Sequence, residues 1–235
     1  MEKIEFTVSQ VCDRAWELTK KHGLVIAVVL FVVSVITQTI SMLGFPTGTY
    51  MSALTAGDID ALVEVTNGLN SFSITSLFAG ILIMVLSAGL LNCVIKLTSG
   101  EMKNFELSGF KMPINTYVYF FLANIVLVLI IFFGIMLCII PGIILGVRLI
   151  FVLPYILTHP EAGFGDAFKQ SWEMTKGHFW NLLGLGLLYG IFCFLGLLCC
   201  CIGVYFAAAM GYFMLCVAYS MLSNDPVACE EAKVD

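Results

Sequence analysis

Long apolar stretches alternate with short polar segments along most of this chain. A helix needs about 20 apolar residues to cross the hydrocarbon core of a bilayer, because each residue adds about 1.5 Å to a layer about 30 Å thick. The stretches that approach or reach this length are 24–43, 73–95, 116–140, 143–157, 179–199 and 203–222. The pattern predicts an all-α, polytopic bundle of about six transmembrane helices that forms a single membrane domain over residues 1–235.

Local residues set the boundaries between the later spans. Pro141 and Gly142 predict a turn between the third and fourth spans, because proline lacks a backbone donor and glycine tolerates a turn. Arg148 and Pro154 interrupt the fourth span, and Pro154 predicts a kink there. The last two spans are separate in this prediction, because one helix over 179–222 would exceed the thickness of a bilayer.

Composition excludes a soluble protein. The chain is 60% apolar and 11% charged, with a mean hydropathy of +1.00, whereas a soluble domain is about a quarter charged. No basic run is long enough to predict nucleic-acid binding. The polar first twenty residues contain both charge signs and do not resemble a cleavable signal, so the first span is expected to serve as the insertion signal.

The distribution of basic residues predicts the orientation. Apart from Arg148, Lys and Arg fall before span one, between spans two and three, between spans four and five, and after span six. Such residues accumulate on the cytoplasmic side. Both termini and the tail 223–235 are therefore predicted to be cytoplasmic, with 44–72 as an outer loop, in a cell membrane that we expect to be a bacterial inner membrane. The predicted interfacial anchors at the inner surface are Trp16, Trp172 and Trp180.

An internal match is the clearest motif. The segment VCDRAWELTKKHG from Val11 aligns without gaps with AFKQSWEMTKGHF from Ala167, sharing W-E-x-T-K-x-H. The pattern predicts amphipathic interfacial helices over 7–22 and 164–178, each followed by a two-span hairpin. A weaker copy, NFELSGFKM, precedes the third span, which suggests three repeated units. The alternative is that a good interfacial helix arose twice.

The stretch IIPGIILGVRLIFVLPYILTHPEAGFGDAFKQSWEMTKGHFW resembles a known family of uncharacterised bacterial membrane proteins. That family is related to the membrane domain of glycerophosphodiester phosphodiesterases. The matching elements are Pro141-Gly142, Arg148, Pro154, the helix with Ala167 and Ser171, the Lys176-Gly177 pair, and LSGFK at 107–111. The likeness begins near residue 90, and the first hairpin matches poorly.

This resemblance implies a six-span, all-helical membrane domain without phosphodiesterase activity. In the related enzymes the chemistry sits in a separate soluble barrel, which nothing in this chain resembles. The sequence also lacks paired carboxylates, a nucleophile motif, a phosphate-binding glycine loop and metal-site spacing of Cys and His. An enzyme, a cofactor and a metal are therefore not expected.

Arg148 is the one ionisable residue inside a predicted span. An intramembrane arginine is costly, so it marks a site or a buried pairing. The candidate partners are backbone carbonyls, water, a bound anion such as a lipid phosphate, or the amides of Gln38, Asn92 and Asn124. The alternative, which we prefer from the sequence, is a structural arginine that reaches outward and pins its helix.

Small residues at helical spacing predict close helix packing. Gly142-x-x-x-Gly146 and Gly186-x-x-x-Gly190 are expected to let a neighbouring helix approach, within the bundle or alternatively in a homodimer.

Three functions are compatible with these sequence features. The first is a module that interacts with membrane lipid, anionic lipid in particular, or organises it, with Arg148, Lys20 and Lys176 as contacts. The second is a small transporter or channel for an amphiphilic or anionic solute. The third is a structural partner of another membrane protein.

Overall fold

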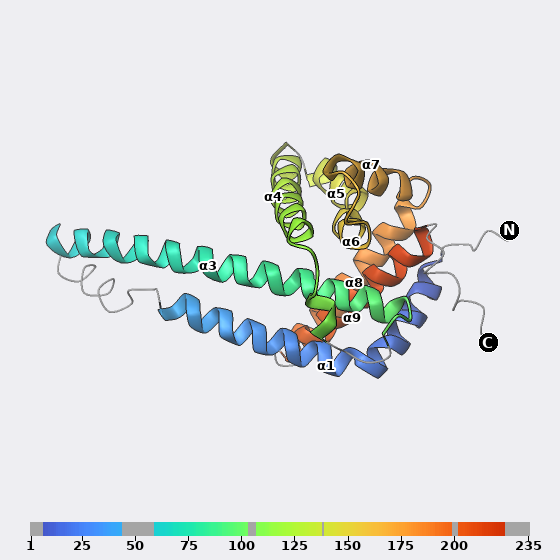
Figure 1. The fold of residues 1–235 in the computed structure, drawn as a ribbon, viewed down its shortest axis with the longest axis horizontal. Helices are drawn as coiled ribbons and strands as arrows, with labels where there is room; N and C mark the ends of the chain where they lie inside the picture. Colours follow the sequence, from blue (N-terminus) through green and yellow to red (C-terminus); the bar gives the residue numbers. More distant parts are fainter. Residues whose placement is uncertain (1–6, 44–58, 103–106, 138, 199–201, 224–235) are drawn as a thin grey trace. The chain divides into compact units, whose positions relative to one another are not determined.

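The computed structural model describes residues 7–43, 59–102, 107–137, 139–198 and 202–223, and within them the chain is helical with no strand (Figure 1). The elements are α1 (Val8–Leu43), α3 (Ile59–Thr98), the 3-10 helix η1 (Leu107–Phe110), α4 (Ile114–Leu137), α5 (Ile139–Arg148), α6 (Val152–Thr158), α7 (Phe164–Met174), α8 (Phe179–Leu198) and α9 (Ile202–Leu222). The all-α prediction is confirmed.

In the described part of the chain, six helical segments are long and apolar enough to cross a membrane. They are Val8–Thr39, Ala79–Thr98, Ile114–Met136, Ile140–Thr158, Phe179–Leu198 and Gly203–Leu222. Large apolar side chains on them are exposed, for example Met136 at 74% and Leu187 at 71%. Hydrocarbon is the solvent that accommodates such a surface, because water would penalise it.

The first two spans differ in extent from the prediction. The interfacial helix expected over 7–22 and the span expected over 24–43 are one continuous helix, α1. The helix continues because Gly23 keeps a helical backbone, with Thr19 and Phe206 nearest to its open side. Helix α3 begins at Ile59, inside the loop expected over 44–72, because no proline interrupts the residues that follow. The rest of that loop, up to residue 58, lies outside the described residues.

Pro141 and Gly142 do not form the predicted turn, because both lie inside helix α5. Helix α5 already begins at Ile139, which places Pro141 in the first helical turn, where a missing N–H leaves no intrahelical bond unmade. Gly142 instead allows close packing of α5 on α4. A Cβ atom added to Gly142 would lie 2.8 Å from the backbone nitrogen of Ile135, and one added to Gly134 would lie 2.9 Å from the Cα of Gly142.

A similar glycine pair joins α8 to α9. A Cβ added to Gly196 would lie 2.7 Å from the carbonyl oxygen of Gly203. By contrast, a Cβ added to Gly146, Gly186 or Gly190 would meet no described atom within 4 Å. Within the described part of the chain, the side toward which a Cβ of each of these three glycines would point therefore lies in open space and not against a neighbouring helix.

The chain divides into two compact units, which are described separately. One contains residues 29–87, and the other contains residues 1–28 and 88–235. In the second unit α4 packs against α5 and α6, α6 against α7, α5 against α8, and α8 against α9. Its largest fully buried side chains include Phe151 and Phe213. Both sites described below lie in this unit.

Candidate functional site

The fourth span is broken between α5 and α6. Helix α5 ends at Arg148, and α6 starts at Val152 with Pro154 in its first turn. Because Pro154 has no N–H, a continuous helix would leave the carbonyl of Ile150 without its partner. The chain turns instead, with the amide of Val152 donating to the carbonyl of Leu149 at 3.2 Å. The break leaves the carbonyl of Arg148 and the amide of Phe151 to bond outside the helix.

Helix α7 supplies those partners. The Ser171 hydroxyl donates to the carbonyl of Arg148 at 2.9 Å and accepts from the amide of Phe151 at 3.2 Å. Thr175 Oγ1 lies 3.5 Å from the same Arg148 carbonyl and 3.0 Å from the carbonyl of Ser171. Ser171 and Thr175 are both 0% exposed. Since an unpaired backbone group is costly in an apolar medium, these bonds fix α7 to the break in the span.

The Arg148 side chain lies against aromatic rings. Its guanidinium carbon is 5.1 Å from the ring centroid of Trp172 and 5.9 Å from that of Phe179. Both distances are within the range of a cation–π interaction. The Nη1 atom is buried and has no hydrogen-bond partner among the described residues. The aromatic rings attract the charge, but they leave this strong donor unsatisfied.

A groove of about 460 Å³ runs along α7 beside this cluster. It is lined by Leu149, Gly165, Phe168, Lys169, Trp172, Glu173 and Lys176. Trp172 belongs to both the groove and the Arg148 cluster, and it is 39% exposed. Two lysines beside apolar side chains suit a ligand that has both an anionic group and a hydrocarbon part.

The matching segment of α1 is built in a similar way. Ala15 and Thr19 are buried at the positions of Ser171 and Thr175, and Thr19 Oγ1 donates to the carbonyl of Ala15 at 2.6 Å. Lys20 Nζ lies 5.4 Å from the ring centroid of Trp16, which is 41% exposed. Each segment therefore presents an exposed tryptophan with a cation over its ring, although in α7 the cation comes from Arg148.

The structure thus brings some of the predicted site residues together and separates others. Arg148, Trp172 and the α7 groove with Lys176 form one cluster, whereas Lys20 and Trp16 form another on α1. Trp180 is 78% exposed and makes an edge contact with Phe179 at 5.6 Å.

Asn92, an amide considered as a partner of Arg148, donates to the carbonyl of Gly109 at 2.7 Å instead. Sequence reasoning missed the roles of Ser171, Thr175 and Phe179. A small or hydroxyl residue at every fourth position, at 167, 171 and 175, was the available signal for the first two.

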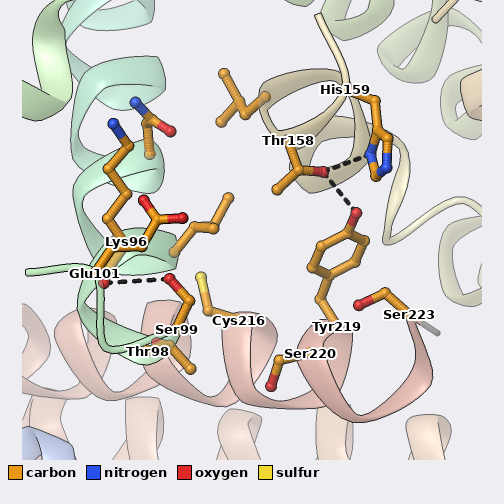
Figure 2. A pocket seen from close by; sticks show the side chains of 13 residues that line it. Lys96, Thr98, Ser99, Glu101, Thr158, His159, Cys216, Tyr219, Ser220 and Ser223 are labelled. Atoms are coloured by element: carbon orange, nitrogen blue, oxygen red, sulfur yellow. Dashed lines mark hydrogen bonds between the residues drawn. The ribbon is translucent and has the colours of Figure 1, made fainter. Parts of the chain in front are cut away.

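A second cavity, which no sequence pattern indicated, lies among the carboxyl-terminal ends of α3, α6 and α9 (Figure 2). Its volume is about 250 Å³. On one wall the Thr158 hydroxyl is 2.7 Å from the Tyr219 hydroxyl and 2.9 Å from His159 Nδ1. In the described part of the chain, no group of three or more Cys, His, Asp or Glu side chains is placed so that it could hold a metal ion.

The fold and these sites define an all-helical, multi-pass integral membrane protein. Residues 110–223 match the family described as the membrane domain of glycerophosphoryl diester phosphodiesterase. The match confirms the resemblance predicted from the sequence over α4 to α9, including the whole Arg148–α7 cluster, but it begins at Phe110 instead of near residue 90. It concerns a membrane domain and assigns no catalysis. No curated protein and no solved structure matches the chain.

Proposed function

We propose that the chain is a lipid-interacting membrane module that binds the phosphate of an anionic lipid at the Arg148–α7 cluster. The observation that carries this proposal is the buried Nη1 atom of Arg148, which has no hydrogen-bond partner among the described residues. A planar guanidinium donor matches the oxygens of a phosphate, and charge-assisted bonds of this kind are among the strongest available to a protein.

The groove favours a lipid over a free anion. Lys169 and Lys176 supply further positive charge, while Phe168 and Leu149 supply an apolar surface along the same groove. An exposed tryptophan such as Trp172 is typical of the membrane interface, where one part of the ring is buried and its N–H stays hydrated. Lys20 beside Trp16 gives α1 a comparable, simpler contact for a headgroup. We further propose that these segments are copies of one amphipathic interfacial unit.

The proposal includes the orientation in which both termini are cytoplasmic, so that Lys20 and Lys176 face the inner leaflet of a cell membrane. The anionic lipids of that leaflet would attract both lysines. Single cysteines introduced in 44–72 of a cysteine-free variant are expected to react with an impermeant maleimide added outside intact cells. Labelling that requires broken cells would reverse the orientation.

Lipid retention tests the binding site. The protein is extracted from vesicles that contain equal amounts of phosphatidylglycerol and phosphatidylcholine, and the lipid that remains bound is measured by mass spectrometry. Arg148→Gln combined with Lys176→Gln is expected to lower the retained ratio of phosphatidylglycerol to phosphatidylcholine by about tenfold, because a charge-assisted hydrogen bond contributes about 1.5–3 kcal/mol.

One matched control and one further test variant accompany this double variant. Lys111→Gln removes a positive charge from an exposed position outside the groove, and it should leave the ratio unchanged. Lys20→Gln tests the α1 segment and should cause a smaller decrease. An equal ratio in the wild type, the double variant and the Lys111 control would exclude the proposed site. A decrease of the same size in the Lys111 control would show that general surface charge attracts the lipid.

A further inference from the structure

The cavity at the carboxyl-terminal ends of α3, α6 and α9 has the size of a small polar group. Its volume of about 250 Å³ would hold about eight water molecules at ~30 Å³ each. Its lining includes Lys96, Ser99 and Glu101 at and just after the end of α3, and Thr158, Tyr219 and Ser220 on α6 and α9. Figure 2 shows these side chains around a shared space.

The hydroxyl groups on its walls are arranged as acceptors. Thr98 Oγ1 donates to the carbonyl of Val94 at 2.8 Å, Ser99 Oγ to that of Lys96 at 3.3 Å, and Ser220 Oγ to that of Val217 at 2.9 Å. A hydroxyl has one hydrogen, so each of these groups keeps only its lone pairs for a ligand. The cavity therefore favours a ligand that donates several hydrogen bonds.

The charges on its walls also favour a cation. The formal charges of Glu101 and Lys96 cancel, but the last turns of α3 and α9 also contribute to the lining. The end of a long helix carries about half a negative charge. The sum is a negative potential close to hydroxyl acceptors, which is the environment that a –NH₃⁺ group requires.

The opposite wall has a fixed shape. Thr158 bonds to Tyr219 across the two elements, and the rings of Tyr155 and His159 stack at a centroid distance of 4.4 Å. The ring of Tyr219 in turn packs on Phe151 at 5.9 Å. Because these groups satisfy one another, a ligand meets a preformed surface and does not have to order it on binding.

We infer that this cavity binds a primary ammonium group, provided either by the headgroup of an aminophospholipid or by a free small amine. The wall hydroxyls of Thr98, Ser99 and Ser220 offer acceptors for its N–H donors, and Glu101 offers a counter-charge. A quaternary ammonium has no N–H donor and is recognised by a cage of aromatic faces. The walls described here offer mainly hydroxyl and apolar groups, so the cavity discriminates against it.

Calorimetric titration of the full chain in detergent micelles tests the inference. The probes are free ethanolamine, free choline, and micelles doped with short-chain phosphatidylethanolamine or phosphatidylcholine. We expect at least one ethanolamine-bearing probe to bind, and the choline-bearing probes to bind with at least tenfold lower affinity. Binding of free ethanolamine identifies a free amine as sufficient, whereas binding of the phospholipid alone identifies the lipid headgroup.

Variants connect the binding to this cavity. Glu101→Gln should weaken it about fivefold, the effect of roughly 1 kcal/mol for a partly screened ion pair, and Ser220→Ala should weaken it as well. Glu161→Gln removes an exposed carboxylate outside the cavity, and Ser87→Ala removes a hydroxyl that also donates to a carbonyl three residues earlier. Neither control should change binding.

Equal affinity for choline-bearing and ethanolamine-bearing probes would overturn the inference, as would unchanged binding in both cavity variants. Binding of inorganic phosphate in place of the amine would overturn it too. The melting temperature without ligand shows whether each variant is folded. Since no cavity variant touches Arg148 or α7, retention of phosphatidylglycerol and binding of the amine can fail independently.

Discussion

The segments that start at Val11 in α1 and at Ala167 in α7 share the residues W-E-x-T-K-x-H, yet they have different structures. In α1 the helix runs on without a break into its membrane span. Helix α7 ends at Met174, and a turn separates it from α8. Both segments bury the same face, with Ala15 and Ser171 at equivalent positions. The shared signature is therefore compatible with one buried face in both segments and leaves open whether the helix continues.

One residue accounts for the difference in continuation. Gly177 has a φ of +86°, a conformation that glycine adopts without strain, and it allows the chain to turn after α7. The equivalent residue in α1 is Lys21, whose side chain disfavours that backbone conformation. A second residue determines what the segment does: Ser171 bonds to the break between α5 and α6, and Ala15 has no hydroxyl for such a bond.

The largest effect is expected when Ser171 is made like its counterpart. Ser171→Ala leaves the Phe151 amide without its hydroxyl partner and leaves the Arg148 carbonyl with only the long 3.5 Å contact to Thr175. A fully orphaned buried group costs about 1–3 kcal/mol. We expect the free energy of unfolding in mixed micelles, followed by circular dichroism, to fall by about 2–4 kcal/mol.

The reciprocal change, Ala15→Ser, provides the control. The added hydroxyl can bond to the carbonyl four residues earlier in α1, as Thr19 does with Ala15, so the expected change is under about 1 kcal/mol. Similar losses of unfolding free energy in the two variants would show that Ser171 contributes only a small buried side chain, and not its hydrogen bonds to the break in the span.

The number and nature of the spans were predictable from the sequence, because apolar length alone decides whether a helix can cross a bilayer. The boundaries of the helices were less predictable from the sequence. The turn near Pro141 and the continuity of α1 depend on where proline and glycine fall within a helical turn. At Gly146 the spacing suggested a close contact inside the bundle, but a Cβ added there meets no described atom within 4 Å, because spacing does not show which face meets a neighbour.

The candidate site was predictable only in part. Arg148 and the tryptophans stood out by residue type. A charge within an apolar run is rare and costly, and tryptophan is enriched at membrane interfaces. The contact of Arg148 with Phe179 and the bonds of Ser171 to the break join residues that are twenty or more positions apart. The amine-sized cavity gathers residues from three distant helices, so no local pattern could indicate it.

An intermediate effect is expected at the residue that ends the helix. Gly177→Lys makes α7 match α1 and places a side chain at φ +86°, which costs about 1–2 kcal/mol. A Cβ added there meets no described atom within 4 Å, so the change tests backbone conformation and not crowding. Lys21→Gly in α1 is the counterpart and should cost about 1 kcal/mol, the effect of glycine inside a helix. If Gly177→Lys left the free energy of unfolding unchanged in the same assay, the turn would not need a positive φ.

The smallest effect concerns the cation over each tryptophan, and it separates a partly buried cation, Arg148, from an exposed one, Lys20. Double-mutant cycles with Arg148→Met and Trp172→Leu, and with Lys20→Met and Trp16→Leu, measure the two coupling energies in the unfolding assay. The coupling of Lys20 with Trp16 should be about 0.5 kcal/mol and should shrink in high salt, because Lys20 is exposed. The coupling of Arg148 with Trp172 should be about 1–2 kcal/mol and insensitive to salt, because the Nη1 atom is buried. Equal couplings would mean that the two segments hold their cations alike, and that the burial of Arg148 adds nothing to its attraction for the ring.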